Sequence, residues 1–136
     1  MTHHSPQKNR RRQGAAVAEL AVCLPLIFLL LMSSLEVCGT IFLRQGLNIA
    51  AYEGAVVAAR KGSTTSSVTT RVNAILTGRN IRNSTVAVSP APESTSPGTQ
   101  ITVTVTANAS SNSLVPIPRF NTSTITVQMK SVREDI

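Results

Sequence analysis

The sequence predicts an α+β protein: a long N-terminal helix, transmembrane in its first half, then a short helix and a small antiparallel sheet of about three strands. Three observations predict this fold. No charged residue occurs from Leu20 to Leu35, small residues recur every four positions from Gly46 to Gly62, and apolar residues alternate with polar ones from Val86 onward. The first pattern indicates a membrane span, the second a helix face, and the third β-strands.

The charge of the chain is concentrated at its start. The 136 residues carry 13 basic and 6 acidic side chains, a net charge of +7. Lys8 and Arg10 to Arg12 precede the apolar stretch, and without these four the balance is nine basic against six acidic residues, or +3. Aromatic residues make up only 3%, and no basic stripe interleaves with them, so nucleic acid is not an expected partner. The cluster instead predicts a cytoplasmic N-terminus.

The apolar stretch predicts a transmembrane helix over residues 15–43 in the inner (cytoplasmic) membrane, with lipid as its surroundings. A span needs about 20 residues. Small residues precede the apolar core, whereas an ordinary secretory signal carries its small-residue cleavage site after the core. We therefore expect the segment to be retained, to be bent at Pro25, and to bring Glu36 to the outer membrane interface.

A polar extension of the same helix is predicted outside the membrane, over residues 44–62. It carries a ridge of small residues with a period of four, which ends at the glycine stop that follows Lys61. The ridge consists of Gly46, Ala50, Gly54, Ala58 and Gly62. Such a ridge lets a second helix approach closely, or it packs under the chain's own C-terminal domain. The sequence leaves both alternatives open.

Residues 63–136 predict a small extracytoplasmic α+β domain. Ser66 or Ser67 can cap a second helix that Gly78 closes. One side of this helix is apolar, through Val68, Val72, Ile75 and Leu76. With so few aromatic residues the core is thin. We therefore expect the domain to pack against the outer half of the long helix for stability.

The strands of this domain are predicted around Val86–Val88, over residues 101–106 and over residues 125–129. A turn-rich connection lies between Pro90 and Gly98. Residues 114–118 are apolar but interrupted by prolines, which indicates an edge or a docked loop. The sheet should have one apolar face and one threonine face.

A glutamate stands near the mouth of the apolar stretch. Glu19 follows Gly14 by five residues, and a carboxylate within hydrocarbon costs several kcal/mol unless it is paired. Cleavage after Gly14 would free the amine of Ala15 one helical turn away, where it could pair with Glu19 of the same chain or of a neighbouring copy. This arrangement is typical of the leaders that prepilin peptidases cut, and it predicts a basic leader over residues 1–14.

Catalysis is not expected, and neither are a metal or a cofactor. The only histidines are His3 and His4 in the N-terminal tail, which removes the usual general base and the usual zinc ligand. No phosphate loop or dinucleotide glycine pattern occurs. Cys23 and Cys38 are about 22 Å apart along a helix, so a disulfide within one chain is excluded.

Two segments resemble the TadE-like family, the pilin-like or minor-pilin components of tight-adherence type IV pilus systems. They are residues 12–21 (RQGAAVAELA), with Pro25 after them, and residues 47–55 (LNIAAYEGA). The resemblance implies a pilin-like fold, removal of the leader after Gly14 by a prepilin peptidase, Ala15 as the mature N-terminus and Glu19 as the acidic residue of the motif. It also implies other pilins or pseudopilins as partners and no catalytic activity.

Two functions therefore remain. The first is a minor pilin or pseudopilin that acts in assembly of a tight-adherence-type pilus for surface attachment, with incorporation into the pilus left open. The alternative is an uncleaved, signal-anchored extracytoplasmic binding module. Only the spacing of Gly14 and Glu19 and the long outer helix favour the first over the second.

Overall fold

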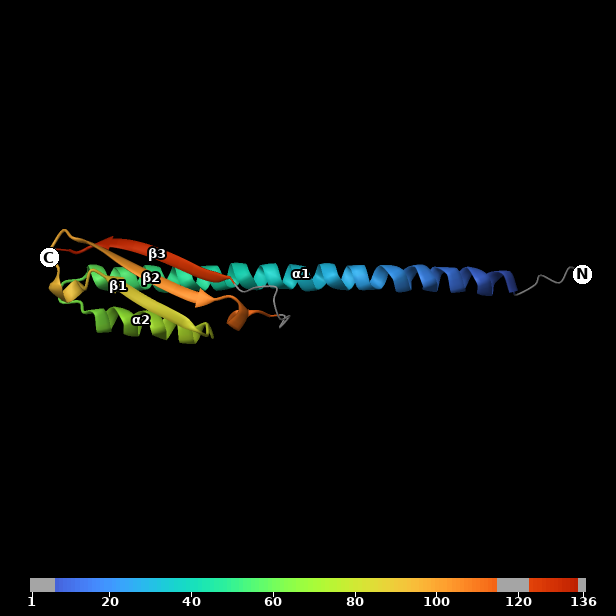
Figure 1. The fold of residues 1–136 in the computed structure, drawn as a ribbon, viewed down its shortest axis with the longest axis horizontal. Helices are drawn as coiled ribbons and strands as arrows, with labels where there is room; N and C mark the ends of the chain where they lie inside the picture. The colour runs from blue at the N-terminus through green and yellow to red at the C-terminus, as the bar shows by residue number, and fades with distance from the viewer. Residues whose placement is uncertain (1–6, 115–122, 135–136) are drawn as a thin grey trace, which may run out of the picture. The chain divides into compact units, whose positions relative to one another are not determined.

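The computed structural model describes residues 7–114 and 123–134, and the side chains from residue 14 onward within these ranges. The chain forms two compact units, Met1–Leu35 and Glu36–Ile136. The elements follow in the order α1, α2, β1, β2 and β3 (Figure 1), with two short 3-10 helices among the strands. The predicted α+β fold is confirmed: a long N-terminal helix, a short helix and a three-stranded antiparallel sheet.

The long helix α1 spans Gln7–Ala59. Pro25 lies inside it without ending it, although proline removes one backbone hydrogen bond. The helix stops close to the predicted place, because Gly62 takes a φ of +75°, a conformation that glycine adopts without a Cβ penalty. The Ser63 hydroxyl then donates a hydrogen bond to the Ala58 carbonyl at 2.9 Å.

The second helix, α2, spans Thr65–Gly78 and begins with a capping box. The Thr64 hydroxyl accepts from the Ser67 N–H at 3.2 Å, and the Ser67 hydroxyl accepts from the Thr64 N–H at 3.1 Å. The predicted cap at Ser66 or Ser67 was therefore wrong: Thr64 is the cap, and Ser67 is its reciprocal partner three residues later. The apolar side is as predicted, with Val68, Val72 and Leu76 buried and Ile75 packed beside them.

The sheet is an antiparallel meander in the order β1-β2-β3. Strand β1 spans Ser84–Ser89, β2 spans Gln100–Asn108 and β3 spans Thr124–Val132. Every second residue of β2 is buried, so the sheet has an apolar face on one side and a threonine face on the other. The 3-10 helices are η1, Pro92–Ser94, and η2, Ser110–Asn112. Of the expected edge or docked loop at 114–118, only Leu114 lies within the described residues.

The core of the second unit lies between the sheet, α2 and the outer part of α1. The α1 side chains in it are mostly small: Leu43, Leu47, Ala50, Ala51, Ala55 and Ala58. Against them pack the inner side of α2 and the apolar residues of β2, and Leu47, Val72 and Ile101 are fully buried. The domain thus packs against α1, as expected from its thin aliphatic core.

Candidate functional site

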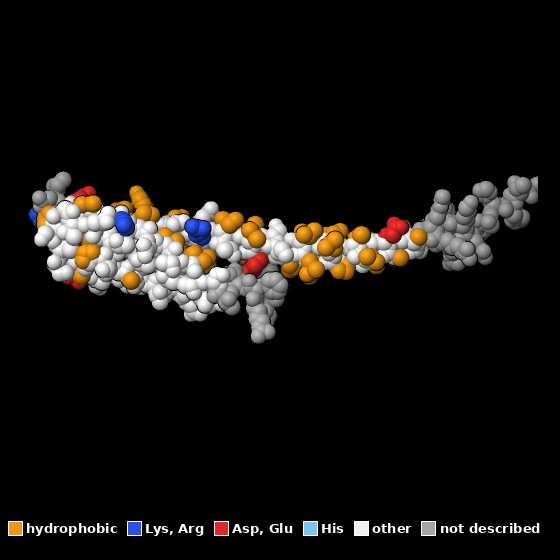
Figure 2. All heavy atoms as spheres, turned by 45° about the horizontal axis from the view of Figure 1, so that its top comes forward, with side chains coloured by type: hydrophobic (Ala, Val, Ile, Leu, Met, Phe, Trp, Pro, Cys, Tyr) orange, Lys and Arg blue, Asp and Glu red, His pale blue; other side chains and the backbone are white. Residues whose placement is uncertain are grey.

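The first part of α1 presents an apolar surface on all sides. From Gly14 to Leu31 every described residue is exposed, and hydrophobic side chains cover this part of the helix (Figure 2). By length and composition, Gly14–Ala59 contains one stretch that can cross a membrane, as judged over the described residues. An apolar helix that is exposed all round is expected in lipid or against other apolar helices.

Gly14, Ala15 and Glu19 lie together on this exposed part of α1. A Cβ added at Gly14 would meet no atom within 4 Å, so the peptide bond after it is not shielded by side chains of the described residues. Ala15 and Glu19 are four residues apart, one turn of helix with a rise of about 6 Å. A free amine at Ala15 would therefore lie within reach of the Glu19 carboxylate.

The second acid of the apolar helix, Glu36, lies at the start of the second unit. Its Oε2 accepts a hydrogen bond from the Ser113 hydroxyl at 2.8 Å, and its backbone carbonyl accepts from the Thr40 hydroxyl at 3.0 Å. Glu36 is half-buried. The structure thus ties the loop after β2 to α1 close to the expected outer membrane interface.

The small-residue ridge packs beneath the chain's own domain. Gly46, Ala50, Gly54 and Ala58 are all buried. A Cβ at Gly54 would lie 2.5 Å from Val72 Cγ2 and 3.2 Å from Val103 Cγ1, and a Cβ at Gly46 would lie 2.6 Å from Ile81 Cδ1. The ridge therefore serves close contact with α2 and β2 within one chain, whereas the last of its residues, Gly62, is exposed beyond the helix.

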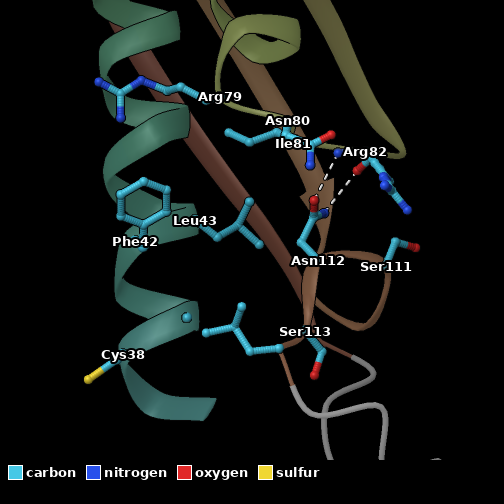
Figure 3. Close-up of a pocket in the computed structure, with 12 residues that line it drawn as sticks. Cys38, Phe42, Leu43, Arg79, Asn80, Ile81, Arg82, Ser111, Asn112 and Ser113 are labelled. Atoms are coloured by element: carbon cyan, nitrogen blue, oxygen red, sulfur yellow. Dashed lines mark hydrogen bonds between the residues drawn. The ribbon is translucent and has the colours of Figure 1, made fainter. Parts of the chain in front are cut away.

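A groove of about 550 Å³ lies within the second unit. One wall comes from α1, with Phe42 and Leu43, and the other from the loops after α2 and after β2 (Figure 3). The Asn112 side chain holds these two loops together: its Oδ1 accepts from the Arg82 N–H at 2.8 Å, and its Nδ2 donates to the Arg82 carbonyl at 2.9 Å.

The remaining candidate residues are two cysteines and two histidines. Cys23 and Cys38 are free and exposed. His3 and His4 lie outside the described residues. Within the described part of the chain, no three His, Cys, Asp or Glu side chains lie close enough to hold a metal ion together.

A family model described as TadE-like protein matches residues 14–56. This segment is TadE-like. The resemblance that the sequence motifs indicated is confirmed for these residues, which are less than half of the chain. Neither the comparison with curated proteins nor that with solved structures gave a match.

The TadE-like segment contains most of the predicted site residues. It begins at Gly14 and includes Ala15, Glu19 and the ridge as far as Gly54, while Ala58 follows its end. TadE-like proteins are a pilin-like structural family, and the similarity to them is confined to residues 14–56.

Sequence reasoning missed the groove and the contacts that shape it. Asn112 and Arg82 are 30 residues apart, and Ser113 and Glu36 are 77 apart. The serine-rich stretch around Asn112 looks like any polar turn, so no local signal identifies it as the link between two loops.

Proposed function

We propose that this chain is a membrane-anchored minor pilin or pseudopilin that acts in assembly of a tight-adherence-type pilus for surface attachment. The observation that carries the proposal is the TadE-like match, which begins at Gly14 and covers the whole apolar helix. The exposed apolar surface of that helix supports it, because such a surface needs lipid or partner helices.

The proposal includes removal of residues 1–14 by a prepilin peptidase at the cytoplasmic face. The exposed position of Gly14 supports this step. Hydrolysis of the peptide bond between Gly14 and Ala15 gives a carboxylate on the leader and an α-ammonium on the mature chain. The whole basic cluster, Lys8 and Arg10 to Arg12, leaves with the leader.

The new α-ammonium gives Glu19 a partner. A carboxylate that is half satisfied in a low-dielectric surrounding favours association with a second charged group. Ala15 of the same chain or of a neighbouring pilin can supply it. Pairing between subunits would couple cleavage to assembly, because only cut chains carry the ammonium at the correct depth.

We propose that the chain crosses the membrane once. Residues 15–43 cross the inner membrane with the N-terminus in the cytoplasm, residues 44–62 extend the helix outside, and residues 63–136 form the extracytoplasmic domain. The Lys8 and Arg10–Arg12 cluster supports this orientation, since basic residues flanking a span stay in the cytoplasm.

Deletion of the coding sequence in the native host tests the function. Loss of surface pili and of surface attachment, with both restored by the wild-type chain, is the expected result. Full piliation and full attachment without the chain would contradict a role in assembly. The alternative, an uncleaved binding module, predicts that pili form normally and that the isolated chain still begins at its original N-terminus.

A further inference from the structure

The sheet of the second unit has an open edge at β3. The strand order is β1-β2-β3, so β3 has a neighbouring strand on one side only (Figure 1). An edge strand presents a row of main-chain N–H and C=O groups that can pair with a further strand. β3 is nine residues long, whereas β1 at the opposite edge has six, so β3 offers the longer row.

The hydrogen bonds to β2 show which residues of β3 direct their main chain outward. The Ala109 N–H donates to the Ser123 carbonyl at 3.0 Å, and the Arg133 N–H donates to the Thr99 carbonyl at 3.0 Å. Residues of an antiparallel strand alternate in the neighbour they bond, so the odd-numbered residues of β3 bond β2. The even-numbered residues therefore direct their N–H and C=O groups outward, and among the described residues no hydrogen bond reaches these groups.

An apolar groove of about 270 Å³ lies beside β3, against the outer part of α1. We call it the β3 groove; α1 contributes Tyr52 and Val56 to it, and β3 contributes Met129 and Val132. Tyr52 is 56% exposed and Val132 is 54% exposed, so an added strand would cover both. Ser131 also lines the groove, and its buried hydroxyl has no hydrogen-bond partner within the described part of the chain.

Basic side chains flank one end of the β3 groove. The Glu134 N–H donates to the Ala59 carbonyl at 2.8 Å, which joins the end of β3 to the end of α1. Arg60 and Lys61 directly follow Ala59 and are exposed, and Lys130 is exposed on β3 itself. None of these three cations forms a salt bridge with another described residue. A lysine on an edge strand disfavours pairing with a strand that brings no acid, so a strand that pairs here has to carry a carboxylate.

We propose that an extended segment of another protein adds to β3 as a fourth, antiparallel strand, with apolar side chains in the β3 groove and a carboxylate beside Lys130. The main-chain groups of β3 supply the affinity, while the groove and the cations select the segment. A second copy of this chain fits less well, because neither β1 nor β3 contains an acid. The inference concerns the second unit alone and does not depend on the membrane span or on cleavage of the leader.

The test uses the full chain in detergent and two synthetic peptides of the same length as β3. The first alternates valine with threonine and carries glutamates where antiparallel pairing places them beside Lys130. The second has the same sequence, with methyl groups on the main-chain nitrogens that would donate to β3. Tyr52 is the only tyrosine, and the chain has no tryptophan, so tyrosine fluorescence reports on the β3 groove. The first peptide should change this fluorescence to saturation and the second should not. Equal binding of both peptides, or binding of neither, would overturn strand addition.

Gln128→Pro closes the edge without removing a bond to β2. The N–H of this even-numbered residue points outward, and proline is accepted at such positions of an edge strand. Binding of the first peptide should weaken by about tenfold, because one peptide carbonyl loses its donor and stays unpaired. Gln128→Thr is the matched control, since it changes the same side chain but keeps the N–H, and it should bind as wild type does. Equal affinity of the two variants would contradict the proposal.

Lys130→Glu tests the charge preference separately from the fold of the edge. Lys130 is exposed, and its replacement should weaken the glutamate peptide and favour a peptide with lysines in place of the glutamates. An unchanged order of the two peptides would count against the carboxylate. The mass of the chain without peptide is measured alongside: a dimer that becomes a monomer in Gln128→Pro would assign the edge to a second copy and overturn the proposal. None of these outcomes alters the N-terminus or the piliation that tests the proposed function.

Discussion

At the scale of single residues, two glycines of the same helix lie in opposite surroundings. Gly14 is exposed with free space around it, whereas Gly54 lies in the contact between α1, α2 and β2. Glycine thus has two different effects: at Gly14 it leaves the following peptide bond accessible, and at Gly54 it allows a close approach between elements.

In the proposed function, Gly14→Phe should block removal of the leader, because the benzyl group adds bulk directly beside the peptide bond that is cut. The expected result is a larger, membrane-held precursor in native cells, seen by gel migration or intact mass. Thr2→Phe adds the same bulk to the tail and should leave processing unchanged. If the Gly14 variant and wild type migrate alike, the leader is misassigned.

Gly54→Ala should destabilise the second unit by about 1–3 kcal/mol, the usual cost of overpacking a core. The added methyl would lie 2.5 Å from Val72 Cγ2, and both neighbouring elements would have to move. Denaturant unfolding of the chain in detergent measures the loss.

Gly78→Ala is the matched control, since a Cβ there meets nothing within 4 Å. Gly78 belongs to α2, so alanine should be neutral or stabilise by about 0.4–1 kcal/mol. Equal destabilisation by both substitutions would mean that the ridge is not a close-packing surface.

At the scale of elements, hydrogen bonds join parts of the chain that periodicity treats as separate. Glu93 in η1 is the clearest case. Its Oε2 accepts from the Thr65 N–H at 2.8 Å, and both of its carboxylate oxygens accept from the Thr65 hydroxyl at 3.0 Å. A carboxylate here also interacts favourably with the N-terminus of α2.

These contacts make the stability of the domain dependent on pH. Hydrogen bonds from its own backbone N–H and from that of Thr65 lower the pKa of Glu93 below its ordinary value of 4.5. Because the folded-state pKa is the lower one, the stabilisation is complete above the unfolded-state pKa and is lost as the pH falls through the folded-state pKa. Glu93→Gln should therefore lower the Tm at pH 7, and the difference from wild type should shrink as the pH is lowered below 4.5. A Tm difference that stays the same as the pH is lowered would contradict the assignment.

Elements defined by periodicity were predictable, and their contacts were not. The four-residue ridge, the apolar side of α2 and the alternation in β2 each identified an element from neighbouring residues. The N-cap was missed because Thr64, Thr65, Ser66 and Ser67 all carry a capping hydroxyl. The sequence did not decide which element packs against the ridge, because small residues allow any neighbour to approach closely. The groove depends on Asn112 and Arg82, which only the fold brings together.

At the scale of the whole molecule, the chain combines two different parts. The first is an apolar helix whose exposed side chains need lipid or partner helices around them. The second is a domain that buries its own apolar core. The TadE-like match ends within the outer helix, and the sheet follows it. In the proposed function the first unit supplies association and anchorage, while the second presents a folded surface outside the membrane.

Glu19→Ala should leave membrane insertion intact and weaken recovery of pilin partners. Removing the carboxylate makes the helix more apolar, so insertion costs less, but the partner's ammonium loses its counter-charge. Co-purification from native membranes, quantified against total chain, measures the effect. Glu134→Ala removes a carboxylate from an exposed position outside the helix and should recover partners as wild type does. Unchanged recovery with the Glu19 variant would contradict pairing.

The most direct measurement is the N-terminus of the protein isolated from its native membrane, by Edman sequencing or intact mass. The account predicts that the chain begins at Ala15, with residues 1–14 absent, so that its α-ammonium lies one turn from Glu19. A chain that still begins at Met1 or Thr2 in material competent for pilus assembly would contradict it.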